Sequence, residues 1–168
     1  MEIYFLRHGL AGQHGDPKYK DDSLRPLTAE GRKKMRLVAQ GMQALGLTFD
    51  VVLSSPYLRA RQTAEAVTQV YKLKNKTMRL TNNLLPPASI KKLLQEILAH
   101  FPKSKNVLLV GHEPHLSGMV SSLLNSGKPL NIDFKKGGLC SVTVQDESAT
   151  LNWLLTPTQL GLMAKEKQ

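Results

Sequence analysis

Short apolar runs alternate with amphipathic stretches along most of this chain. The runs have the length and the β-branched or aromatic content of buried strands. They cover residues 3–6, 51–53, 78–81 and 106–110. The stretches between them repeat apolar side chains at intervals of three and four residues, the period of an amphipathic helix. Helices are therefore predicted over residues 28–45, 57–71 and 90–98, with another beginning at Pro114.

Local residues support the ends of these elements. Ser89 precedes the helix at 90–98 as a candidate N-cap, and Gly46 follows the first predicted helix as a candidate stop. Near the end of the chain the pattern changes to alternation over residues 139–144 and 150–155, with the polar segment 146–148 between them. This change predicts two strands joined as a β-hairpin.

Strands that alternate with helices imply right-handed crossovers and a mostly parallel sheet. We therefore predict an α/β fold: a three-layer sandwich with a mostly parallel central sheet, helices on both faces and a C-terminal β-hairpin. At 168 residues the chain is long enough for one core and short for two, so residues 1–168 are expected to form a single domain. Ligands of such sheets bind beyond the carboxyl ends of the strands.

Composition narrows the class of protein. The hydrophobic fraction of 41% and the charged fraction of 21% are those of an ordinary globular protein. The N-terminal residues have no basic region, and no stretch of about 18 apolar residues occurs, so neither an export signal nor a membrane span is expected. The single cysteine, Cys140, cannot form an internal disulfide, which agrees with a reducing compartment. We expect a cytoplasmic protein.

The net charge of +10 is unusual, and it could serve a nucleic acid, an acidic protein or an anionic small substrate. Lysines stand in scattered pairs, at 33–34, 91–92 and 135–136, without interleaved aromatic side chains. Single-stranded nucleic acids are bound on aromatic platforms, and no DNA-binding motif is visible in the sequence. We therefore expect a solvated surface and no nucleic-acid partner.

Charged side chains and histidines follow three of the predicted strands. Arg7, His8 and Gly9 follow the first strand, Arg59 lies shortly after the second, and His112 follows the last parallel strand. A phosphoryl group carries close to two negative charges, and arginine binds it through two parallel hydrogen bonds. The N-terminal end of the helix that carries Arg59 would add backbone dipoles of the right sign. These residues together predict a phosphate site.

A neutral histidine in such a pocket can attack phosphorus if its other ring nitrogen is held by an acceptor. His8 would then form a phosphohistidine that water hydrolyses, while the arginines and His112 balance charge on the phosphoryl oxygens. This scheme requires neither a metal nor another cofactor. His112 and His115 have a spacing that suits a metal, but the sequence offers no third ligand nearby, so we expect none.

Four segments of the chain together resemble the histidine phosphatase superfamily, which has the phosphoglycerate mutase-like fold. They are Arg7-His8-Gly9, Leu-Thr-Ala-Glu-Gly at 27–31, the segment 54–64 around Arg59, and Gly-His-Glu-Pro at 111–114. These segments span most of the chain in the order of the family's motifs, which makes the resemblance specific.

The resemblance implies a role for each matching residue. His8 matches the family's phosphorylated nucleophile. The other candidate residues are expected to hold the phosphoryl group or the substrate. They are Arg7, Gly9, Arg59, His112 and Glu113. Arg61 stands at a variable position of the family's Arg-Ala-x-Gln-Thr pattern, so the resemblance gives it no role.

Within the superfamily the chain is similar to the small SixA-type phosphohistidine phosphatases. Ala11 stands where larger members commonly carry serine, and the short segment 81–89 leaves little chain for a helical roof. The segment 81–86 also lacks the glutamate that protonates a leaving oxygen in many members. Imidazole leaves from a P–N bond more readily than an alkoxide leaves from phosphorus. These features favour phosphohistidine on a signalling or phosphotransfer protein, such as a histidine-phosphotransfer domain.

Other hypotheses stay open at this point. Glu113, Asp16 or Asp22 could supply a proton to a leaving oxygen, so hydrolysis of a small phosphomonoester is the enzymatic alternative. A phosphoprotein-binding module with low turnover is the alternative outside enzymes. The sequence leaves the oligomeric state and the physiological partner undetermined.

Overall fold

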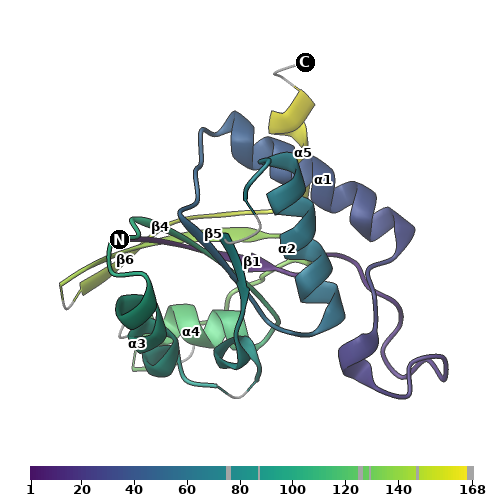
Figure 1. Ribbon diagram of the computed structural model, residues 1–168, viewed down its shortest axis with the longest axis horizontal. Helices are drawn as coiled ribbons and strands as arrows, with labels where there is room; N and C mark the ends of the chain where they lie inside the picture. The colour runs from purple at the N-terminus through teal and green to yellow at the C-terminus, as the bar shows by residue number, and fades with distance from the viewer. Residues whose placement is uncertain (75–76, 87, 125–126, 129, 147, 166–168) are drawn as a thin grey trace.

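A six-stranded sheet forms the centre of the molecule, and helices cover both of its faces (Figure 1). The computed structural model describes residues 1–74, 77–86, 88–124, 127–128, 130–146 and 148–165. The strands are β1 (Glu2–Arg7), β2 (Val51–Ser54), β3 (Met78–Leu80), β4 (Asn106–Gly111), β5 (Leu139–Gln145) and β6 (Ser148–Leu155). Their order across the sheet is β3-β2-β4-β1-β5-β6. The first four of these are parallel, and β5 and β6 are the antiparallel hairpin at the other edge.

The helices of the described segments form two outer layers. They are α1 (Ala29–Ala44), α2 (Leu58–Val70), α3 (Ile90–His100), α4 (His115–Leu123) and α5 (Pro157–Lys165), with short 3-10 helices η1 (Asp22–Leu24) and η3 (Asn82–Leu84). One face of the sheet packs against α1, α2 and α5, and the other packs against α3 and α4 (Figure 1). The predicted three-layer α/β fold with its C-terminal hairpin is confirmed. None of the described helices is long and apolar enough to cross a membrane.

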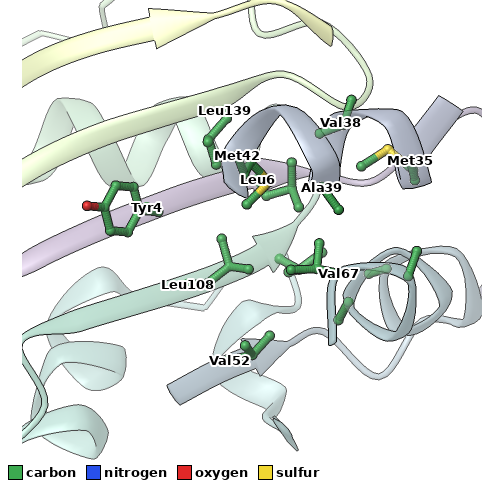
Figure 2. Packing of buried hydrophobic residues seen from close by; sticks show 14 of the residues in the cluster. Tyr4, Leu6, Met35, Val38, Ala39, Met42, Val52, Val67, Leu108 and Leu139 are labelled. Carbon is green, nitrogen blue, oxygen red and sulfur yellow. The ribbon is translucent and has the colours of Figure 1, made fainter. Parts of the chain in front are cut away.

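The central strands are buried on both faces. In β1, Tyr4 and Leu6 belong to the core under α1 and α2, where Figure 2 shows them beside Leu108. Ile3 and Phe5 belong to the core on the opposite face. Because both sets of side chains leave water, the run is continuously apolar rather than alternating, as expected for a parallel sheet.

The helix ends follow from local residues. The Thr28 side chain accepts the backbone N–H three residues further on at 2.9 Å, and the predicted cap Ser89 accepts the N–H two residues further on at 3.2 Å. Gly46 ends α1 with a φ of +73°, and the Leu47 N–H returns to the Met42 carbonyl at 3.1 Å. This Schellman motif needs the left-handed backbone conformation that glycine adopts most easily.

Two features at the C-terminal end differ from the prediction. Helix α5 was not predicted, because nine residues of which only Pro157, Leu160 and Ala164 are buried make a weak periodic signal. Strand β6 begins at Ser148 rather than at residue 150, and Ser148 pairs with Gln145. Glu147, which the predicted turn includes, lies outside the described residues. Because Gln145 and Ser148 already pair, the hairpin connection is shorter than expected.

Helix α5 packs unusually close to α1 at Gly41. A Cβ placed on Gly41 would lie 2.0 Å from the Leu160 carbonyl oxygen. Because that oxygen belongs to backbone, Gly41→Ala should push the helices apart and lower the free energy of unfolding by about 1–3 kcal/mol. The control is Gly161→Ala on α5, where a Cβ has no neighbour within 4 Å. It should raise stability by about 0.8–1 kcal/mol. Urea unfolding measures the free energy of unfolding of both variants. An equal change in the two would contradict close packing at Gly41.

The register of the sheet brings three strand ends together. Arg7 on β1 is paired with Gly111 on β4, and Ser54 on β2 is paired with Val110 on the same strand. The residues that follow continue this pairing, since the His8 N–H donates to the Gly111 carbonyl at 3.0 Å. The carboxyl ends of β1, β2 and β4 therefore lie side by side, and the predicted site residues meet there.

Candidate active site

His8 is held by backbone on the exit of β1. Its Nδ1 lies 2.7 Å from the carbonyl oxygen of Gly9, and only 6% of the residue is exposed. A carbonyl oxygen can only accept, so Nδ1 carries the hydrogen and the neutral ring has its lone pair on Nε2. The fold therefore selects the tautomer with its lone pair on Nε2, the form that a nucleophilic role requires.

Gly9 serves the site by holding His8. Its N–H donates to the Thr63 hydroxyl at 3.1 Å and its carbonyl accepts from His8, so both of its polar groups are engaged within the protein. A Cβ on Gly9 would lie 2.6 Å from Cγ of Met35, whereas its φ is not in the left-handed region. Glycine is needed here for close packing against α1 rather than for an unusual backbone conformation.

His112 lies beside His8 after β4. The two rings have centroids 5.1 Å apart, and the residue is 3% exposed. Nε2 of His112 is 2.8 Å from the hydroxyl of Ser55, which follows β2. Its Nδ1 is buried and has no hydrogen-bond partner. The second histidine thus has one ring nitrogen anchored by the protein and the other available to a ligand.

The two predicted arginines show the same arrangement. A terminal nitrogen of Arg7 donates to the Phe134 carbonyl at 2.5 Å, and the terminal nitrogens of Arg59 donate to Asp22. The Nε atom of each arginine is buried without a partner. Since buried donors are rarely left unpaired, these two Nε–H groups and Nδ1 of His112 suit a multi-oxygen anion such as a phosphoryl group.

Both histidines are held neutral. Burial lowers the pKa of His8 to about 3, and the hydrogen bond to Gly9 offsets this effect only in part. Burial likewise lowers the pKa of His112 to about 3, and the charge of Arg59 acts in the same direction. At neutral pH His8 therefore keeps the unprotonated Nε2 that attack on phosphorus requires.

The depressed pKa of His8 should appear in the pH dependence of stability. The unfolded residue takes up its proton near pH 6.5 and the folded one only near pH 3. Between these values the unfolded chain binds one more proton, so acid destabilises the protein. The free energy of unfolding of the wild type, relative to His8→Asn, should fall by up to about 1.4 kcal/mol per pH unit. Urea unfolding between pH 7 and 4 measures the difference.

The control for this experiment is an exposed histidine. His100 lies at the exposed end of α3, so His100→Asn should keep the wild-type dependence on pH. Parallel stability curves for the wild type and His8→Asn would show that the ring of His8 titrates normally in the folded protein.

The structure gives the other candidate residues contacts of their own. Both carboxylate oxygens of Glu113 accept hydrogen bonds from Ser117, at 2.7 and 3.0 Å, so Glu113 caps α4. Asp16 accepts the Lys18 N–H at 2.9 Å in a local turn. Arg61 pairs with a glutamate one turn along α2 at 3.3 Å and is half exposed.

Asp22 is ionised under ordinary conditions. Burial opposes its charge, but contacts with His14, Arg59 and Arg25 outweigh that effect and lower its pKa to about 2. A carboxyl group of this kind cannot deliver a proton near neutral pH. The hypothesis that Asp22 protonates a leaving oxygen is therefore disfavoured by its surroundings.

A carboxylate does contact the segment after β3, although it does not come from that segment. Glu96 of α3 accepts hydrogen bonds from the Thr81 hydroxyl at 2.6 Å and from the Asn83 amide at 2.7 Å. Glu96 lies ten residues beyond the segment 81–86, so no local pattern in that segment points to it. Glu96 holds the segment in place through these two bonds.

Several residues around the pocket were not found from the sequence. Ser55, Thr63, Arg25 and the carbonyl of Phe134 orient the predicted residues. Ser55 and Thr63 stand inside the 54–64 motif, which could have marked them, whereas no local pattern marks Arg25 or Phe134. Within the ranges that the structure describes, no three His, Cys, Asp or Glu side chains form a cluster able to hold a metal ion.

The chain is similar to known proteins. The family model of the histidine phosphatase superfamily (branch 1) matches residues 3–82. An uncharacterised protein of Picosynechococcus is 37% identical over 141 residues, covering 83% of this chain and 82% of its own length. The phosphohistidine phosphatase SixA of Escherichia coli is 29% identical over 165 residues, covering 96% of this chain and 98% of its own.

A solved structure agrees with these relatives. The protein histidine phosphatase SixA complexed with tungstate superimposes with a TM-score of 0.83 at 28% identity, over 95% of this chain and 99% of that one. The motifs, the parallel sheet and the paired histidines at its edge all occur in this chain in one arrangement. The chain therefore belongs to the histidine phosphatase superfamily, and its fold is that of SixA.

Proposed function

We propose that the protein is a phosphohistidine phosphatase, which removes phosphoryl groups from a histidine of a signalling or phosphotransfer protein through a covalent phosphohistidine on His8. The observation that carries the proposal is the neutral His8 ring, which donates its Nδ1 hydrogen to the Gly9 carbonyl and keeps a lone pair on Nε2. Similarity to the phosphohistidine phosphatase SixA over nearly the whole chain supports the substrate class.

The first step transfers the phosphoryl group to His8. The lone pair on Nε2 forms a P–N bond while the P–N bond to the substrate ring breaks, and that electron pair stays on the leaving nitrogen. Arg7 and Arg59 bind the phosphoryl oxygens through their buried Nε–H groups, and His112 contacts the group through Nδ1. Their contribution is positioning and charge balance in a site largely shielded from water.

The second step returns the enzyme to its starting state. Water attacks phosphorus, the P–N bond to His8 breaks, and its electron pair returns to Nε2. The proton lost by the water goes to the released phosphate or to solvent. Throughout both steps the hydrogen stays on Nδ1 and is donated to the Gly9 carbonyl, so the same tautomer serves attack and departure.

The leaving group favours phosphohistidine over a phosphomonoester. A phosphorylated imidazole that is protonated on its other nitrogen departs as neutral imidazole, whereas an alkoxide needs a proton from the protein. The carboxylates near the site are otherwise engaged, because Asp22 is paired with arginines, Glu113 caps α4 and Glu96 holds the segment after β3.

The surroundings of the site also suit a protein substrate. A groove of about 420 Å³ is lined by Pro114 and His115, which follow His112 in the sequence after one residue, and by Ser89 and Ile90 at the start of α3. The segment between β3 and α3 is short, and its described residues form the single helical turn η3. A chain segment flanking a phosphorylated side chain has room beside the pocket.

A substrate comparison tests the proposal. The unsubstituted protein is assayed with a histidine-phosphorylated phosphotransfer protein, phosphoserine and an aryl phosphate, and kcat/KM is expected to be highest for the phosphohistidine protein. A higher value for a small phosphomonoester would favour the alternative of a small-molecule phosphatase. Tight binding of the phosphorylated protein without release of phosphate would identify a binding module instead.

A further inference from the structure

Residue 22 holds the end of the Arg59 side chain. Its carbonyl oxygen accepts from Nη1 of Arg59 at 2.8 Å, and its carboxylate Oδ2 lies 3.0 Å from Nη2. One residue thus satisfies both terminal nitrogens of the guanidinium, while Nε is left buried and unpartnered. Because the five N–H donors of arginine form a rigid planar fork, fixing one edge determines the direction of the other.

The other carboxylate oxygen of Asp22 links this contact to the exit of β1. Oδ1 accepts from Arg25 at 3.0 Å and lies 2.9 Å from Nδ1 of His14. Arg25 in turn donates to the Gly12 carbonyl at 2.7 Å. The network therefore ties α2 to the loop that follows His8, two segments far apart in the sequence.

Charge makes this arrangement depend on the carboxylate. The side chains of Arg25 and Arg59 are only 10% and 6% exposed, and Asp22 lies between them. Without a negative charge there, two buried guanidinium groups would lie close together with no counter-charge between them, and they would repel each other. Loss of the carboxylate should therefore move Arg59 rather than merely weaken one surface contact.

We propose that Asp22 is a positioning residue, which fixes the guanidinium of Arg59 so that its Nε edge meets the phosphoryl group. This inference rests on the proposed function, because it concerns the arginine that would bind the transferred group. Asp22 acts through Arg59 and does not itself take part in bond making.

A double-mutant cycle tests this role. Asp22→Asn, Arg59→Lys and the double variant are compared in kcat/KM for the phosphohistidine protein and in the Kd for inorganic phosphate. Asp22→Asn should lower kcat/KM by about 10- to 100-fold, since displacement of a positioning group by about 1 Å has effects of this size. The double variant should have the same kcat/KM and Kd as Arg59→Lys, because Asp22 has no guanidinium group to orient once Arg59 is replaced.

The neighbouring aspartate provides the matched control. Asp21 is exposed, and its side chain accepts the Ser23 N–H at 2.8 Å, which asparagine also accepts. Asp21→Asn therefore makes the same change of charge without touching Arg59. It should stay within about twofold of the wild type. Equal losses from Asp21→Asn and Asp22→Asn would overturn the inference.

Two further outcomes are decisive. Tighter phosphate binding by Asp22→Asn would show that the carboxylate competes with the ligand. A further loss of kcat/KM when Asp22→Asn is added to Arg59→Lys would show that Asp22 has an independent or merely structural effect. Either result overturns the inference. Inorganic phosphate separates this test from that of the substrate. Coupling seen in phosphate binding, without hydrolysis of phosphohistidine, would uphold the role of Asp22 and contradict the proposed substrate.

Discussion

His8→Ala should abolish turnover, with a loss of kcat on the order of 10⁴- to 10⁶-fold, the range seen when a covalent nucleophile is removed. The reason is that the reaction would lose the atom that receives the phosphoryl group, whereas Arg7, Arg59 and His112 would remain to bind substrate. Binding of a phosphorylated partner should therefore survive in the variant. The expected signature is tight binding with hardly any release of phosphate.

Trapping of the intermediate measures this directly. The wild type, mixed with labelled substrate and quenched with alkali, should carry label that is stable to alkali and released by acid, as a P–N bond requires. His8→Ala should carry none, and the exposed His100→Ala should label normally. If His8→Ala carried the same amount of label with the same lability, another residue would be the nucleophile.

Arg59→Lys should lower kcat by about 10²- to 10³-fold, the usual cost of removing one donor that stabilises transition-state charge. Lysine keeps the positive charge but presents one flexible ammonium group in place of a planar fork. It cannot use two edges at once, one on Asp22 and the other on the phosphoryl oxygens. Steady-state kinetics with the phosphohistidine protein provides the measurement.

Arg61 offers a matched control for this substitution. It lies two residues from Arg59 on α2, is half exposed, and pairs only with Glu65 one turn away. Because exposed pairs of this kind contribute little, Arg61→Lys should change kcat by less than about twofold. A wild-type rate in Arg59→Lys, or equal losses in both variants, would show that the fork of Arg59 has no special part in the reaction.

Most of the fold could be predicted because its elements carry strong local signals. The strands β1, β2 and β4 are continuous apolar runs, since each is buried on both faces. Caps such as Thr28 and Ser89 act within one helical turn, so their partners are near in sequence. Helix α5 could not be predicted in the same way, because its position depends on the surface of α1 at Gly41.

The candidate site could likewise be predicted only in part. Arg7 ends β1, and His8 and His112 directly follow β1 and β4. A rule about the ends of parallel strands was enough to group them with Arg59. The atoms that orient them come from unrelated parts of the chain. The Phe134 carbonyl on Arg7 and the Ser55 hydroxyl on His112 lie 127 and 57 residues away in sequence.

The sequence by itself determined the elements, their order and the chemical types gathered at the strand ends, because side-chain periodicity, capping and motif spacing act over short distances along the chain. Only the tertiary structure decided the state of those groups. The His8 tautomer, the neutral form of both histidines and the pairing of Arg59 with Asp22 depend on burial and on contacts across the fold. Desolvation and hydrogen-bond geometry are properties of three-dimensional surroundings, so no local pattern encodes them.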